Sequence, residues 1–250
     1  MLQIRNLTKI YDGGVKALDN VSFDLPDGQF LAVIGLSGSG KSTLLRCINR
    51  LIDPTEGEII WNGVDITKAS PEEMRLIRRK IGMVFQHFNL VHRSKVITNV
   101  LAGRLGYVNP AWSLMNRFPP KDIAQAMKQM ERVGIADKAN DRADELSGGQ
   151  QQRVGIARAL MQDPEMILAD EPVASLDPVL AHSIMRHLED INKNDGVTVL
   201  CSLHFLDIVH RYADHVIALN AGQLVFEGLP KEIDDKKFKD IYGRDAERVG

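Results

Sequence analysis

Apolar and polar residues alternate in the first part of the chain in the way that predicts β-strands. Three stretches alternate in this way or are rich in β-branched residues: 2–11, 16–25 and 58–66. Continuous apolar runs, which are typical of buried parallel strands, lie at 29–35, 81–86, 165–170 and 196–203. Two further apolar segments, 215–220 and 223–228, complete the predicted sheet.

From His87 to Met161 the apolar residues instead recur every three or four positions, which predicts helices. We expect these helices at 96–105, 122–134 and 149–161, and further helices beginning near Gly40 and after the runs at 165–170 and 196–203. Strands that alternate with helices indicate an α/β fold with a mostly parallel sheet and an N-terminal antiparallel β subdomain. The predicted division is a core made of 1–88 and 162–228, an inserted helical subdomain at 89–161, and a short C-terminal tail at 229–250.

Composition narrows the possible partners and the compartment. Lys and Arg total 31 and Asp and Glu 33, for a net charge of -2, so the chain lacks the basic excess of a nucleic-acid-binding protein. No apolar stretch is long enough to span a membrane, and the N-terminus has no signal pattern. Cys47 and Cys201 lie far apart in apolar surroundings, which predicts buried free thiols in the cytoplasm.

A glycine-rich segment follows the apolar run 29–35 and fits the pattern G-x-x-x-x-G-K-[ST]. Glycines let backbone N–H groups surround a phosphate chain, and a helix N-terminus favours anions. Lys41 can reach the β- and γ-phosphates, and the Ser42 hydroxyl can ligate Mg²⁺. A simple glycine turn would look similar, but the strand before the segment and the helix after it favour a phosphate loop. Its predicted ATP-binding residues are Gly35, Ser37, Gly38, Ser39, Gly40, Lys41, Ser42 and Thr43.

Two carboxylates end the apolar run at 165–170. Asp170 is placed to hold Mg²⁺ in the manner of a Walker B aspartate, and Glu171 to deprotonate the attacking water. An Asp-Glu pair alone would be interpreted as a solvated strand end. Together with the phosphate loop it indicates a P-loop nucleotide-binding protein, a class in which kinases, GTPases and ATPases all remain possible.

The segment Leu146–Arg153, LSGGQQQR, resembles the signature motif of the ABC ATPases. We call it the signature segment. Ser147, Gly148 and Gly149 open a helix, so their N–H groups can bind an anion, and Ser147 can also cap that helix. The resemblance implies a RecA-like P-loop NTPase fold and a head-to-tail dimer. In that dimer Ser147, Gly148, Gly149 and Gln150 contact the ATP bound to the other subunit.

The resemblance extends along the chain and assigns four more residues. Tyr11 matches the aromatic residue that stacks on adenine, and Gln86 the Q-loop glutamine that contacts Mg²⁺ or water and senses the membrane partner. Asp177 matches the D-loop aspartate at the subunit interface, and His204 the switch histidine that contacts the γ-phosphate. Without the resemblance, Tyr11 and His204 would be interpreted as structural residues.

Segments 99–106, 142–145 and 168–178 resemble the ATP-binding subunits of phosphonate and phosphite importers. This resemblance implies a homodimer bound to two transmembrane permeases at the cytoplasmic face of the inner membrane, with an extracytoplasmic binding protein as an indirect partner. The transported ligand never touches such a chain, so the sequence leaves its identity open.

Two other functions and one docking question stay open at this point. A soluble ABC-type ATPase of DNA repair or translation would carry a long coiled coil or a second ATPase domain, and this chain has neither. A soluble component of a carbon–phosphorus lyase assembly remains an alternative.

A permease helix is expected to dock at 87–104. The apolar residues of the loop 107–118 form either a partner patch or internal packing: Tyr107, Trp112, Leu114, Met115 and Phe118.

Overall fold

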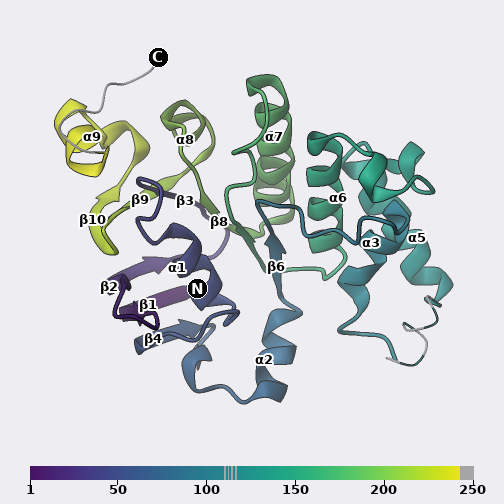
Figure 1. The fold of residues 1–250 in the computed structure, drawn as a ribbon, viewed down its shortest axis with the longest axis horizontal. Coiled ribbons are helices and arrows are strands. Elements are labelled where there is room, and N and C mark those ends of the chain that lie inside the picture. Colours follow the sequence, from purple (N-terminus) through teal and green to yellow (C-terminus); the bar gives the residue numbers. More distant parts are fainter. Residues whose placement is uncertain (110, 112, 114, 116, 243–250) are drawn as a thin grey trace.

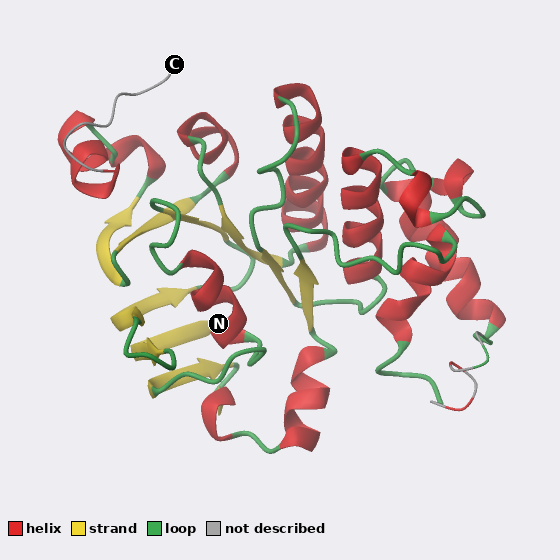
Figure 2. Cartoon of the chain, in the orientation of Figure 1, coloured by secondary structure: helices red, strands yellow, loops and turns green. Residues whose placement is uncertain are grey.

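The computed structural model describes residues 1–109, 111, 113, 115 and 117–242. The chain forms two sheets, one of four strands and one of six, with helices on both sides of the larger sheet (Figures 1 and 2). Within the described residues, no helix is long and apolar enough to cross a membrane.

The four-stranded sheet is antiparallel and comes from the N-terminal part of the chain. Its strands lie in the order β2-β1-β4-β5, and the register places Leu2 opposite Leu25 and Ile4 opposite Phe23. These four side chains are buried, as alternation predicts for a sheet with one covered face. The strands are β1 (Leu2–Ile10), β2 (Lys16–Leu25), β4 (Glu56–Trp61) and β5 (Val64–Asp65).

The six-stranded sheet contains the predicted buried strands. Its order is β10-β9-β3-β8-β7-β6, and all neighbours are parallel except β9 and β10. The mostly parallel sheet of the predicted α/β class is therefore confirmed. The strands are β3 (Phe30–Ile34), β6 (Ile81–Val84), β7 (Met166–Ala169), β8 (Thr198–Ser202), β9 (His215–Asn220) and β10 (Gln223–Gly228).

The larger sheet separates two hydrophobic clusters. Successive residues of β3 point to opposite faces, so Ala32 joins the cluster beneath the long helices, whereas Leu31 and Val33 join the cluster that includes helix α1. Both faces are thus covered, and the central strands are completely buried. The helices are α1 (Lys41–Ile48), α2 (Pro71–Arg78), α3 (Val96–Leu101), α5 (Pro120–Arg132), α6 (Gly148–Leu160), α7 (Pro178–Asp195), α8 (Leu206–Tyr212) and α9 (Asp235–Tyr242).

The predicted helices are present, although two of them are shorter than their patterns indicated. Helix α1 ends at Ile48 rather than near Leu51, and Arg50 has a left-handed φ of 51°. Helix α3 tightens into a 3₁₀ turn after Leu101, where Gly103 lies against the Arg158 carbonyl. Helices α3, α5 and α6 pack on one another in the helical part of the molecule (Figure 1).

Two helices lie where no helix was predicted. Helix α2 begins with a capping box formed by Ser70 and Glu73. Helix α9 lies in the segment expected to be a short tail and packs on β9 and β10. Its Ile241 and the preceding Ile233 are buried in the core, so this segment is part of the fold.

Candidate functional site

Four parallel strands end at the same edge of the larger sheet, and each is followed by predicted site residues. The phosphate loop follows β3, Gln86 follows β6, Asp170 and Glu171 follow β7, and His204 follows β8. Ligands of open parallel sheets bind at this carboxyl edge. We refer to it as the carboxyl edge.

The phosphate loop uses its glycines in two ways. Gly35 and Gly40 have positive φ and lie against backbone, so a Cβ would collide with the carbonyl oxygens of Leu219 and Ala17 respectively. Gly38 also has a positive φ, of 78°, but its surroundings are open within 4 Å. Ser37 and Gly38 are exposed, whereas Ser39 is buried and its hydroxyl has no hydrogen-bond partner among the residues that the structure describes. The loop therefore packs against neighbouring backbone at Gly35 and Gly40 and is accessible to solvent at Ser37 and Gly38, as a phosphate site requires.

Lys41 is almost completely buried at the start of α1. Its ammonium group donates to the carbonyl oxygens of Gly35 and Leu36 at 2.9 and 3.0 Å, and lies 3.7 Å from Glu171 Oε1. Burial lowers its pKa, and the negative charges of Glu171 and Asp170 oppose that shift. The side chain is therefore held beside the loop and next to the carboxylates.

Asp170 is 1% exposed and has three side-chain partners. The Ser42 hydroxyl donates to its Oδ1 at 2.6 Å, Ser202 Oγ lies 3.3 Å from the same oxygen, and Arg46 donates to Oδ2 at 3.3 Å. The structure thus brings together two of the three residues predicted to contact Mg²⁺, Ser42 and Asp170, while the third, Gln86, bonds to the neighbouring Glu171.

Glu171 is the centre of a second set of contacts. Gln86 Nε2 donates to its Oε2 at 3.0 Å, and His204 Nε2 donates to its Oε1 at 2.6 Å. Its backbone has a φ of 47°, which is uncommon for a residue with a side chain. Three residues predicted to be catalytic, Glu171, His204 and Gln86, therefore meet although they are far apart in sequence.

Tyr11 lies at the opening of the phosphate loop. Its hydroxyl is 3.2 Å from Thr43 Oγ1, and its ring is partly exposed, with Lys9 5.3 Å from the ring centroid. An exposed aromatic ring beside the first turn of α1 is suitably placed for stacking on a base.

The signature segment lies away from the carboxyl edge. Ser147 caps α6 by accepting from Gln150 N, and the Gln150 side chain accepts from Ser147 N. Among the described residues, no hydrogen bond or ion pair joins Ser147–Gln150 to the phosphate loop or the two carboxylates. In Figure 1, α7 lies between α6 and α1. Ser147 is exposed, Gly148 and Gln150 are half-buried and Gly149 is buried.

Asp177 has a structural contact of its own. It caps α7 by accepting from the backbone N–H groups of Val179 and Leu180, both at 3.0 Å. A Cβ at Gly148 would lie 3.6 Å from the Leu176 side chain, so the signature segment and the predicted D-loop are neighbours.

Comparison with known proteins identifies the family. The sequence profile of the ABC transporter family matches residues 18–174. The phosphonates import ATP-binding protein PhnC 1 of Halalkalibacterium halodurans is 52% identical over 244 residues, which cover 98% of this chain and 95% of that protein. The phosphonates import ATP-binding protein PhnC of Bdellovibrio bacteriovorus is 50% identical over 250 residues, with 100% and 96% covered. The chain belongs to the ABC transporter ATPase family.

Solved structures agree with this assignment. A dimeric ATP-binding cassette in a post-hydrolysis state, bound to ADP and Pi, superimposes with a TM-score of 0.82 at 34% identity, over 92% of this chain and 99% of that chain. A nucleotide-free cassette superimposes with a TM-score of 0.81 at 34% identity, over 96% and 94%. The fold is therefore that of the P-loop ATPases of this family.

The oxygen donors of this ABC ATPase fit a magnesium ion that is shared with a nucleotide. Ser42 and Asp170 supply a hydroxyl and a carboxylate, which are the hard ligands that Mg²⁺ prefers. Within the described residues, no group of three or more His, Cys, Asp or Glu side chains could enclose a metal. Mg²⁺ typically binds through one or two protein oxygens plus phosphates and water, so the donor set suits a metal that arrives with ATP.

Three contact residues of the ABC ATPase were not found by sequence reasoning. Arg46 and Ser202 touch Asp170, and Arg158 on α6 donates to the carbonyl oxygens of Phe88 and Asn89, just after Gln86. Ser202 left a signal, because it is a polar residue at the end of an apolar run. Arg46 and Arg158 lie on helices where an arginine is unremarkable, so only the fold shows their role.

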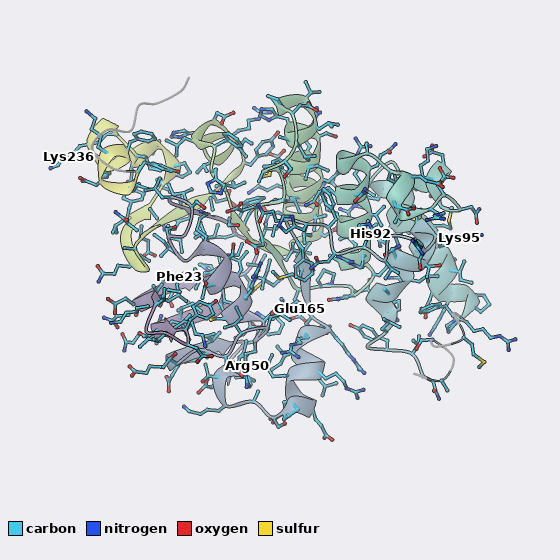
Figure 3. All side chains as sticks on the ribbon, in the orientation of Figure 1. Phe23, Arg50, His92, Lys95, Glu165 and Lys236 are labelled. Carbon is cyan, nitrogen blue, oxygen red and sulfur yellow. The ribbon has the colours of Figure 1, made fainter. Side chains whose placement is uncertain are left out.

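The segment expected to dock a permease runs from the carboxyl edge to the signature segment. Its contacts reach the residues just before the signature segment, since Lys95 forms an isolated β-bridge with Arg142 and the Asp144 N–H donates to His92 O. Figure 3 labels two residues of this segment, His92 and Lys95. In the loop 107–118, Phe118 packs on the core and Tyr107 lies against Arg79 and Arg104, whereas Met115 is exposed. Trp112 and Leu114 lie outside the described residues.

A cavity of about 500 Å³ lies beside Arg104 and Phe118, and none of the ATP-site residues is among the described residues that line it.

Proposed function

We propose that the chain is the ATP-hydrolysing subunit of an importer for phosphonate or phosphite. The observation that carries this proposal is the full-length similarity to proteins named phosphonates import ATP-binding proteins, at about half of all positions. The geometry of the carboxyl edge is consistent with it. The proposed partners are a second copy of the chain, two permeases at the inner membrane, and a binding protein outside the cell. The proposed divisions 1–88 with 162–228, 89–161 and 229–250 describe the core, the helical part and the C-terminal segment.

Hydrolysis would use Glu171 as the base. Glu171 takes a proton from water as the water oxygen bonds to the γ-phosphorus and the bond to the ADP oxygen breaks. Gln86 and His204 each hold one oxygen of this carboxylate, so its orientation is set by contacts within the chain. Lys41 and the phosphate loop bind the phosphates. Mg²⁺, held by Ser42 and Asp170, would neutralise phosphate charge.

Two copies would be needed for a complete site. Among the described residues the signature segment makes no hydrogen bond to its own phosphate loop, and its helix start has an exposed serine, which suits contact with the ATP of the other copy. ATP would thus favour the closed pair over the open pair, and this difference in affinity could move the permeases. Segment 87–104 is the proposed contact with them.

The deciding experiment is reconstitution with the membrane partners in vesicles. Binding protein loaded with a phosphonate should stimulate ATP hydrolysis, and arms with phosphite and phosphate would define the ligand. Co-purification with soluble lyase subunits instead of permeases, together with no stimulation in vesicles, would reject the importer in favour of the carbon–phosphorus lyase alternative.

A further inference from the structure

The buried hydroxyl of Ser202, at the end of β8, contacts both Asp170 and Glu171. Ser202 is the last residue of β8 and is 0% exposed. The backbone N–H of Glu171 donates to Ser202 Oγ at 2.8 Å. The Ser202 hydroxyl proton can reach Asp170 Oδ1 at 3.3 Å or the Ala169 carbonyl oxygen at 3.5 Å. Since a hydroxyl accepts as well as donates, Ser202 engages both members of the Asp170–Glu171 pair.

Glu171 needs such a partner because of its backbone conformation. A left-handed φ of 47° is unfavourable for a residue with a Cβ and persists only where the surroundings fix it. The hydrogen bond to Ser202 is the contact made by the Glu171 N–H, and a backbone donor in this buried region would be costly to leave unpaired.

The segment at the end of β8 also contacts the carboxylate of Glu171. His204, two residues after Ser202, donates to Glu171 Oε1, so β8 fixes the backbone through one residue and the carboxylate through another. We infer that Ser202 is a positioning residue for hydrolysis, which keeps Glu171 in the backbone conformation that aims its carboxylate at the attacking water. This inference rests on the proposed role of Glu171 as the base.

The test is Ser202→Ala in the intact chain, assayed for ATP hydrolysis and ATP binding. Without the hydroxyl, Glu171 can relax, and kcat should fall about tenfold. KM for ATP and the Mg²⁺ concentration at half-maximal rate should stay within about threefold, because the phosphate loop and the 2.6 Å Ser42–Asp170 contact are untouched. Ser202→Thr keeps the hydroxyl and should restore kcat to within about threefold of the wild type.

Cys201→Ala is the matched control. Cys201 is the preceding residue, is equally buried, and joins the hydrophobic cluster under the long helices, on the opposite face of the strand. Its truncation should leave kcat unchanged. Thermal unfolding of each variant separates loss of fold from loss of positioning. If Thr proves too large for the site, Ser202→Cys, with a weakly bonding thiol of similar size, should give a kcat between those of Ala and Ser.

Three results would overturn the inference: wild-type kcat in folded Ser202→Ala, a loss confined to KM, or a folded Ser202→Thr as slow as the alanine variant. Glu171→Gln, measured beside them, separates this inference from the proposed function. Near-normal turnover in Glu171→Gln would remove the base itself. An inactive Glu171→Gln with a normal Ser202→Ala would reject only the role of Ser202.

Discussion

The carboxyl edge and the signature segment both carry groups suited to phosphate, but they satisfy those groups differently. At the carboxyl edge the side chains bond to one another across four strands, as with Glu171, Gln86 and His204. At the signature segment, the side chains of Ser147 and Gln150 each accept from the other's backbone N–H, and Ser147 is exposed. The first region is thus assembled by the chain's own fold, whereas the second is a rigid helix start that is open to another molecule.

The largest effect is expected from Glu171→Gln, which removes the base at the carboxyl edge. Hydrolysis should fall by about a hundredfold or more, while ATP binding stays near normal because the phosphate loop is unchanged. Steady-state phosphate release measures hydrolysis, and the binding of a fluorescent nucleotide measures the affinity for ATP. Glu227→Gln, an exposed change on β10, is the control. Near-normal turnover in Glu171→Gln would mean that the edge does not contain the base.

Ser147→Arg tests whether the signature segment acts on a partner. A long cation in place of the cap should reduce hydrolysis about a hundredfold by blocking the anion contact, with no loss of ATP affinity in the single subunit. Ser70→Arg is a matched control, because Ser70 caps α2 with the same type of capping box far from the ATP site. Each variant should lose about 1 kcal/mol of stability from its cap. Full activity in Ser147→Arg would contradict the composite site.

A pair of glycine substitutions compares the packing of the two regions. Gly35→Ala should destabilise the fold by about 2 kcal/mol, since its φ is 141° and a Cβ would collide with the Leu219 carbonyl. Gly148→Ala should change stability by no more than about 0.5 kcal/mol, because its Cβ would meet only ordinary contacts at 3.6 and 3.7 Å. Denaturant unfolding measures both. Equal losses would show that the signature segment is as tightly enclosed as the loop.

The smallest effect is expected from a thiol reagent. Cys47 and Cys201 are buried, and burial raises the pKa of the Cys47 thiol from 9.0 to about 12. Below pH 9 both remain protonated and enclosed in the native state, so neither should react at pH 8 until the protein is unfolded, when both thiols should react. Rapid reaction of the native protein would show that the sheet behind the carboxyl edge opens readily.

Local sequence patterns predicted most of the fold, and they located several residues that the structure brings together at the carboxyl edge. Apolar runs located the parallel strands, and Asp170 and Glu171 were found because they follow one of these runs directly. What the sequence could not predict depends on contacts between distant segments. Arg46 meets Asp170, and Ser202 meets Glu171, only because β3, β8 and β7 are neighbours in the sheet.

Two omissions had signals that could have been used. The Ser-Pro-Glu-Glu sequence at 70–73 is a capping-box pattern, and it does start α2. In α9, Phe238, Ile241 and Tyr242 recur at helical spacing, and all three belong to or pack on the core. That this segment packs on β9 and β10 could not be predicted, because it depends on the position of the sheet edge.

The order of strands has a consequence for synthesis. β3 leads into the phosphate loop, but its neighbours in the sheet are β8 and β9, which are made near the end of the chain. Gly35 rests against Leu219, and the Gly222 N–H donates to the carbonyl oxygen of Ser39. A chain still emerging from the ribosome therefore carries the complete loop sequence without the strands that shape it. Translation itself therefore delays the shaping of the phosphate loop until β8, β9 and the turn at Gly222 have been added.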